Sequence, residues 1–168
     1  MALVALLSVL GMVNGGCAAH STKNVQDEAQ NERASFLNAD YGNIFGELKP
    51  GMFKECETRG DIVRCQSGAQ FQIGGSNPLV VVGTSHNFFV HEQLMVSHFI
   101  GKYADDKAML AALTTRYGKP TDHEDAELKV TVYDWTDGTL LLRYISYQGL
   151  VGIELVNQKL MDQYRQEQ

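Results

Sequence analysis

The sequence lacks an excess of basic residues, a long hydrophobic run and the motifs of well-known enzymes. Its 14 Lys and Arg residues stand against 20 Asp and Glu residues, which gives a net charge of −6. This charge argues against nucleic-acid binding as the main task, because phosphate neutralisation needs a basic surface. The apolar runs are shorter than the roughly 20 residues of a membrane-spanning helix, which excludes a multi-span membrane protein.

Catalytic motifs with a defined geometry are also missing. The sequence contains no GxSxG nucleophile elbow, no P-loop and no GxGxxG turn. His91-Glu92 begins like the HExxH motif of zinc proteases, but Met95 stands where the second histidine ligand belongs. We therefore expect no catalytic residue, no cofactor and no bound metal ion, and interpret the chain as a non-enzyme.

Three central histidines keep an enzymatic alternative open. His86, His91 and His98 are close in sequence and could meet across a hairpin as metal ligands. A cleft that gathers them with a carboxylate would indicate an enzyme with an unrecognised site, whereas a flat exposed apolar patch would indicate a binding protein. The simpler alternative is that they are ordinary, partly exposed histidines.

The overall composition is that of a globular protein. The chain has 168 residues, of which 44% are hydrophobic and 20% are charged. This length favours one domain, and a chain of this size buries about two-thirds of its unfolded surface.

The first 16 residues have the pattern of a targeting signal. Ala2 to Val13 is apolar apart from Ser8 and Gly11, and small residues follow. This pattern is typical of a secretory signal peptide, although no Lys or Arg precedes the apolar run. A short buried helix is the alternative.

The run from Val13 to Cys17 resembles a bacterial lipobox. Gly15 and Gly16 match its small positions, whereas Asn14 stands where that motif usually has Leu. The resemblance implies cleavage after Gly16 and lipid on Cys17, with two or more acyl chains giving stable anchoring. Because Ala18 is not the Asp that favours inner-membrane retention, the resemblance implies an outer-membrane lipoprotein facing the periplasm. Ordinary secretion, with cleavage near Ala18-Ala19 and a soluble product, is the alternative.

A polar segment separates this signal from the folded part of the chain. Between His20 and Arg33 only Val25 and Ala29 are apolar, so the segment has no surface to bury. We interpret residues 17–35 as a lipidated cysteine and a tether, and residues 36–168 as a single globular domain that begins near Phe36.

The two remaining cysteines are placed to form a disulfide. Cys56 and Cys65 flank a turn with Gly60-Asp61 at its centre. A hairpin with the loop Arg59 to Ile62 brings the two cysteines opposite each other across the strands. In an exported protein we expect them to be bonded.

The segment 69–117 reads as strands followed by one helix. We predict strands over 69–73, 79–82, 87–90 and 94–100, separated by turns at 74–78 and at Gly83-Thr84-Ser85. The helix runs from Asp105, its cap, to Tyr117, and Gly118 ends it. Its apolar stripe consists of Met109, Leu110, Leu113 and Tyr117.

The segment 128–156 predicts a three-stranded meander. Asp137-Gly138 and Gln148-Gly149 are the two turn signals. Taken literally, they place Trp135 opposite Leu140, Tyr133 opposite Leu142, Tyr144 opposite Ile153, and Arg143 opposite Glu154. The aromatic and aliphatic residues then share one face, and the charged pair lies on the other. A short helix is expected over 157–164.

The expected fold is α+β, an antiparallel sheet containing this meander with one main helix packed on one face. The segments Leu48–Met52, Tyr117–Pro120 and Tyr133–Trp135 resemble small envelope lipoproteins of the outer-membrane-assembly and β-lactamase-inhibitor-protein type. Those proteins usually start a helix after Gly-Met, whereas here Phe53 leads into the disulfide hairpin. The resemblance implies a non-catalytic lipoprotein that binds or assists another envelope protein. A surface inhibitor, or a phage or plasmid exclusion factor, is the alternative.

Overall fold

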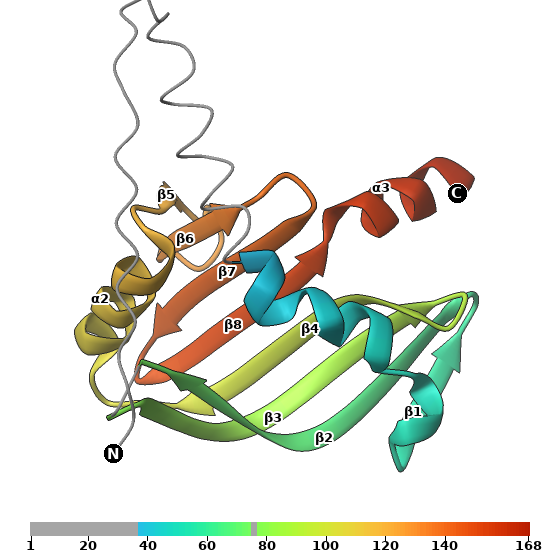
Figure 1. Cartoon of the computed structure of the whole chain (residues 1–168), viewed down its shortest axis with the longest axis horizontal. Coiled ribbons are helices and arrows are strands. Elements are labelled where there is room, and N and C mark those ends of the chain that lie inside the picture. The colour runs from blue at the N-terminus through green and yellow to red at the C-terminus, as the bar shows by residue number, and fades with distance from the viewer. Residues whose placement is uncertain (1–36, 75–76) are drawn as a thin grey trace, which may run out of the picture.

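The computed structural model describes residues 37–74 and 77–168, and within them eight strands form one antiparallel sheet. The strand order is β1-β2-β3-β4-β8-β7-β6-β5 (Figure 1). The strands are β1 (Glu55–Arg59), β2 (Ile62–Ile73), β3 (Leu79–Val90), β4 (Gln93–Lys102), β5 (Thr121–Glu124), β6 (Thr131–Thr136), β7 (Leu140–Tyr147) and β8 (Leu150–Asn157). The predicted signal peptide (1–16), lipidated Cys17 and tether to residue 35 lie outside the described residues.

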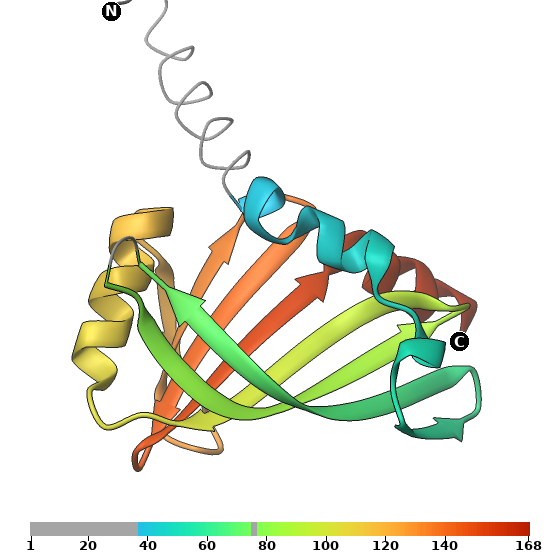
Figure 2. The same ribbon diagram turned by 60° about the horizontal axis from the view of Figure 1, so that its bottom comes forward.

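Helices lie on both faces of this sheet. A helix over residues 37–47 and α2 (Asp106–Tyr117) pack on one face, which we call the inner face, and Figure 2 shows the first of them lying across the curved sheet. The helix α3 (Gln158–Glu167) packs on the opposite, outer face, where Leu160 belongs to one buried cluster with Val96 and Val156. The α+β class is confirmed. The fold is larger than a three-stranded meander with one main helix, because the meander β6-β7-β8 is part of an eight-stranded sheet and helices pack on both faces of it.

The two halves of the chain follow the same plan. A helix precedes β1 to β4 in the first half, and α2 precedes β5 to β8 in the second. The last strands of the halves, β4 and β8, pair at the centre of the sheet, with His98 opposite Glu154. This central pairing joins the halves into one continuous sheet.

The second predicted turn of the meander is confirmed. Tyr144 lies opposite Ile153 and Arg143 opposite Glu154, as Gln148-Gly149 predicts. Both turn residues have positive φ angles, 49° and 77°. A type I′ hairpin turn requires positive φ at both positions.

The first predicted turn is displaced by one residue. Trp135 lies opposite Leu142 and not opposite Leu140, because the turn centre is Gly138-Thr139. The carboxylate of Asp137 accepts hydrogen bonds from the backbone N–H groups of Thr139 and Leu140, at 3.0 and 2.7 Å, and so acts as a cap for the turn. The register shift is two residues, and an even shift leaves every side chain on its predicted face. The predicted buried residues Trp135, Leu142, Tyr144 and Ile153 are therefore buried.

The predicted helix is confirmed with its caps. The side chain of Asp105 accepts a hydrogen bond from the N–H of Ala108 at 3.0 Å, and Gly118 ends α2 with a φ of 82°. Of its apolar stripe, Met109, Leu113 and Tyr117 are buried. The terminal helix is also present, and the segment 94–100 is strand, as favoured from the sequence.

The turn expected at Gly83-Thr84-Ser85 is wrong, because these residues continue β3. Gly83 lies opposite Gly101, and a Cβ atom at Gly83 would collide with the backbone carbonyl of Ile100. This glycine allows β3 and β4 to approach closely.

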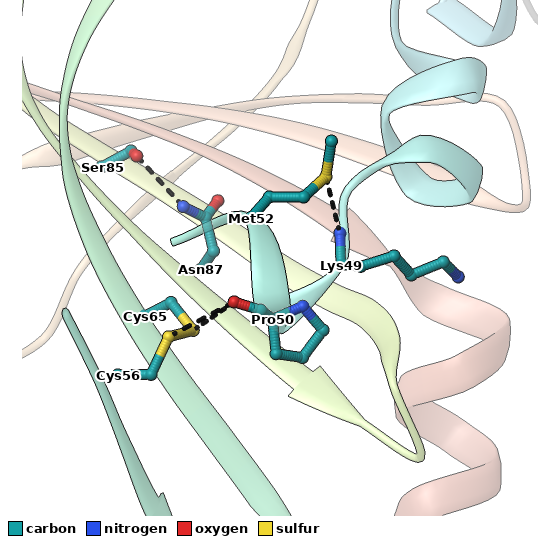
Figure 3. The surroundings of a disulfide bond; sticks show 7 residues. All are labelled: Lys49, Pro50, Met52, Cys56, Cys65, Ser85 and Asn87. Carbon is teal, nitrogen blue, oxygen red and sulfur yellow. Dashed lines mark hydrogen bonds between the residues drawn. A yellow bond between two sulfur atoms is a disulfide. The ribbon is translucent and has the colours of Figure 1, made fainter. Parts of the chain in front are cut away.

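The predicted disulfide is confirmed. Cys56 and Cys65 are opposite each other in the β1–β2 hairpin and are bonded at 2.05 Å. Cys65 is fully buried, and the two sulfur atoms lie 3.6 and 3.9 Å from the carbonyl oxygen of Pro50 (Figure 3). The bond therefore fastens the short edge strand β1 beneath the 3-10 turn η1 (Pro50–Met52).

Candidate functional site

A row of polar side chains crosses the outer face of the sheet. Its members are consecutive cross-strand neighbours on β3, β4, β8, β7 and β6, namely His86, His98, Glu154, Arg143 and Asp134. We call this the polar row. It places His98 between Glu154 and His86.

The charged half of the polar row is internally paired. The guanidinium group of Arg143 donates two hydrogen bonds to Asp134, at 2.9 and 3.0 Å, and a longer one to Glu154 at 3.5 Å. These hydrogen bonds to Asp134, and the charges of both carboxylates, raise the pKa of Arg143. The predicted cross-strand pair is thus present, with Asp134 as a second and closer partner.

The histidines of the polar row are not arranged as ligands of a metal ion. The guanidinium group of Arg64 lies 3.1 Å from Nδ1 of His86, which accepts its hydrogen bond. Burial lowers the pKa of His86, as do the charges of Arg64 and His98, which favours a neutral imidazole. His91 lies apart, in the turn between β3 and β4, so the three histidines do not meet. In the described part of the chain, no group of three His, Cys, Asp or Glu side chains could hold a metal ion.

Exposed apolar side chains gather beside the polar row. They lie on the outer face, at the ends of the strands remote from α3, and are Val80, Val82, Ile100, Tyr147 and Leu150. Val82 is 71% exposed and Tyr147 is 43% exposed. We call this the outer patch. A cluster of solvent-exposed apolar side chains commonly marks an interaction surface.

A cavity of about 450 Å³ lies on the inner face, between helix 37–47 and strands β2, β3, β4 and β8. Ile44 of the helix and Leu48, which follows its last turn, form one apolar wall. The sheet contributes hydroxyl and amide groups at its centre, from Ser67, Ser85, Asn87 and Ser97. The volume is in the range of small-molecule pockets.

A polar cluster holds helix 37–47 against α2. Arg116 pairs with Asp40, and the hydroxyl of Tyr117 lies 3.0 Å from the Asp40 carboxylate and 2.7 Å from the hydroxyl of Tyr41. The hydrogen bond from Arg116 lowers the pKa of Asp40, and burial raises the pKa of Tyr41 to about 12. This cluster fixes the wall of the cavity.

The sequence carries a helical signal over residues 37–48, which begins where the folded domain was expected to begin. Leu37, Tyr41, Ile44, Phe45 and Leu48 recur at helical spacing, and all five are buried or partly buried. Gly42 and Gly46 weaken the helical propensity of the segment. The polar row had no local signal, because it depends on which strands become neighbours.

The chain matches no protein-family model, no curated protein and no solved structure. No helix within residues 37–74 and 77–168 combines the length and the apolar character that a membrane crossing requires. The function is therefore argued from the residues and their arrangement.

Proposed function

We propose that this chain is a non-catalytic envelope lipoprotein that binds another envelope protein through the outer patch. The observation that carries the proposal is the set of five exposed apolar side chains on the outer face, at the strand ends that lie away from α3. The patch has a polar border, because the polar row lies between it and α3. An apolar centre with a polar rim is the usual anatomy of a protein–protein interface.

Tyr147 and Val82 are the best anchors in this surface. Tyr147 is the aromatic residue of the patch, and exposed tyrosines contribute large, well-defined contact areas at interfaces. Its strand neighbour Leu150 extends the contact, and Lys102 lies beside Leu150. A partner with an apolar centre and an acidic group near Lys102 would complement the patch.

The arrangement of the polar row supports binding over catalysis. Arg64 occupies Nδ1 of His86, and Arg143 lies against Glu154. Both groups are thus held by protein partners, whereas a general base needs to reach a substrate proton. His98 and Glu154 are cross-strand neighbours on β4 and β8, and Glu154 already has Arg143 as its partner.

The envelope location rests on the sequence. We propose that lipid on Cys17 anchors the protein in the outer membrane on the periplasmic side, and that the polar tether separates the anchor from the sheet. The disulfide supports an oxidising compartment, because such bonds persist outside the reducing cytosol. The inhibitor or exclusion-factor alternative would use the same surface against a different partner.

The test is capture of the membrane-anchored protein with its bound partner, compared among surface variants. Val82→Glu and Leu150→Glu place a charge in the outer patch, whereas Met52→Glu places one on η1, where Met52 is 65% exposed. We expect the wild type and Met52→Glu to retain one partner protein that both patch variants lose. Equal capture by all four proteins would contradict the assignment of the surface.

A further inference from the structure

The cavity on the inner face has features of a ligand site that the proposed function does not use. Apolar side chains of helix 37–47 cover the cavity, which extends beneath them across the four neighbouring strands β2, β3, β4 and β8. Adjacent strands lie about 4.8 Å apart, so the cavity is on the order of 14 Å long. A space with this span is long enough for a single extended apolar chain.

Asn87 supplies a polar group at the centre of this cavity. Its side chain is 2% exposed, and its Nδ2 donates a hydrogen bond to the Ser85 hydroxyl at 3.1 Å (Figure 3). The Ser85 hydroxyl is in turn 3.0 Å from the Ser67 hydroxyl, and these hydrogen bonds fix the orientation of the Asn87 amide. Figure 3 shows the amide oxygen of Asn87 turned away from Ser85.

This amide oxygen has no hydrogen-bond partner among the described residues. It is also not an enclosed atom, since no fully enclosed side-chain nitrogen or oxygen in that part of the chain lacks a partner. The oxygen therefore opens into the cavity that Asn87 lines. A buried acceptor of this kind gains free energy when a ligand donates a hydrogen bond to it.

The charges of the lining select against acids. Among the described residues that line the cavity, Glu47 is the one charged group, and none is Lys or Arg. A carboxylate that approaches the Asn87 oxygen would find no cation among these residues to compensate its loss of hydration. The lining therefore favours an uncharged head group.

We infer that this cavity binds an uncharged single-chain amphiphile whose head group, a hydroxyl or a primary amide, donates a hydrogen bond to Oδ1 of Asn87. The apolar chain would lie against Ile44, Leu48 and Phe99. This site is on the face of the sheet opposite the outer patch, so the inference does not depend on the proposed protein partner.

The experiment uses dodecanol carrying a photoactivated diazirine on its chain, added to the full-length anchored protein. After illumination, the labelled residues are mapped by mass spectrometry. We expect labels on helix 37–47 and on β2, and displacement by unlabelled dodecanol. Methyl dodecyl ether, which has no donor, should compete about fivefold less well, as the loss of one hydrogen bond implies, and dodecanoate should compete less well than dodecanol.

Variants link the labelling to the cavity. Ser97→Phe and Ala69→Phe fill the cavity from two strands and should abolish labelling, while Asn87→Leu should lower it about fivefold. Thr84→Val, on the outer side of β3, and Val82→Glu, in the outer patch, should leave labelling unchanged. Thermal unfolding of each variant shows whether it is folded.

Three results would overturn the inference. Labels that map to the outer patch would show that the apolar chain binds elsewhere. Unchanged labelling of two folded cavity-filling variants would show that the cavity is not the site. Equal competition by dodecanol, its methyl ether and dodecanoate would show that no hydrogen bond to Asn87 contributes to binding.

Discussion

Arg116 in α2 and Asp40 in helix 37–47 are joined by two hydrogen bonds, of 2.9 and 2.6 Å, although they are 76 positions apart in the chain. This pair connects the helices of the two halves of the fold. Together with Tyr41 and Tyr117, it holds one helix above the inner cavity. The pair therefore both stabilises the fold and fixes the position of the helix that covers the cavity.

Asp40→Asn should destabilise the fold by about 0.5–1 kcal/mol at neutral pH, because Arg116 is half exposed and its pairing is partly screened. The pKa of Asp40 is lowered in the folded state, so its contribution is present above the unfolded pKa and is lost as the pH falls through the folded pKa. The difference in the free energy of unfolding between wild type and Asp40→Asn should thus shrink as the pH falls from about 5 to about 2. Urea unfolding over this range measures it.

The exposed pair Arg165–Asp162 in α3 provides a control. Both side chains are at least 66% exposed and the two residues are one helical turn apart. Asp162→Asn should change stability little at any pH. A pH dependence for Asp40→Asn that is no larger than that of Asp162→Asn would contradict the role of the Arg116 pair.

Removal of the disulfide should destabilise the fold by about 2–3 kcal/mol, because it closes a short loop in the unfolded chain. The double variant Cys56→Ala with Cys65→Ala tests this by urea unfolding. A reducing agent should lower the stability of the wild type but not that of the double variant. Mass spectrometry that finds two free thiols in the non-reduced exported protein would refute the bond.

Gly83→Ala should destabilise the fold by about 1–3 kcal/mol, because the added methyl group collides with the backbone of β4 rather than with a movable side chain. Gly68→Ala is the matched control, since Gly68 lies opposite Thr84 in the neighbouring strand and an added Cβ there meets nothing within 4 Å. We expect Gly68→Ala to be neutral or slightly stabilising. Equal melting temperatures for the two variants would show that the close approach of β3 and β4 is not needed.

Cys17→Ser should release the protein into a soluble fraction or leave it unprocessed. If Cys17 carries lipid as proposed, the variant loses the acyl chains, and the polar sequence of residues 20–33 offers no apolar group that would hold it at a membrane. Membrane fractionation and the mass of the mature chain measure the outcome. Unchanged processing and membrane association would replace the lipoprotein hypothesis with an uncleaved anchor or plain secretion, and would remove the main support for the envelope location.

Features that depend on neighbouring residues were predictable from the sequence. The Cys56–Cys65 hairpin, the caps of α2 and the Gln148-Gly149 turn each need only a few adjacent side chains. The Asp137-Gly138 signal shows the limit of such reasoning. It located the hairpin, but the side chain of Asp137 capped a turn centred one residue later, which a two-residue motif does not specify.

The tertiary structure alone decided which strands became neighbours. Alternation along β4 and β8 indicates that His98 and Glu154 face away from the core, but nothing in either segment states that they are opposite each other. The same applies to Gly83. In the sequence this glycine indicates a turn, whereas in the structure it lies opposite Gly101 and lets two strands approach closely. The local turns, helix caps and strand faces can be read from the amino-acid order, because they follow from short-range geometry. The central β4–β8 pairing, and with it the polar row, the outer patch and the cavity, depended on contacts between residues far apart in the chain.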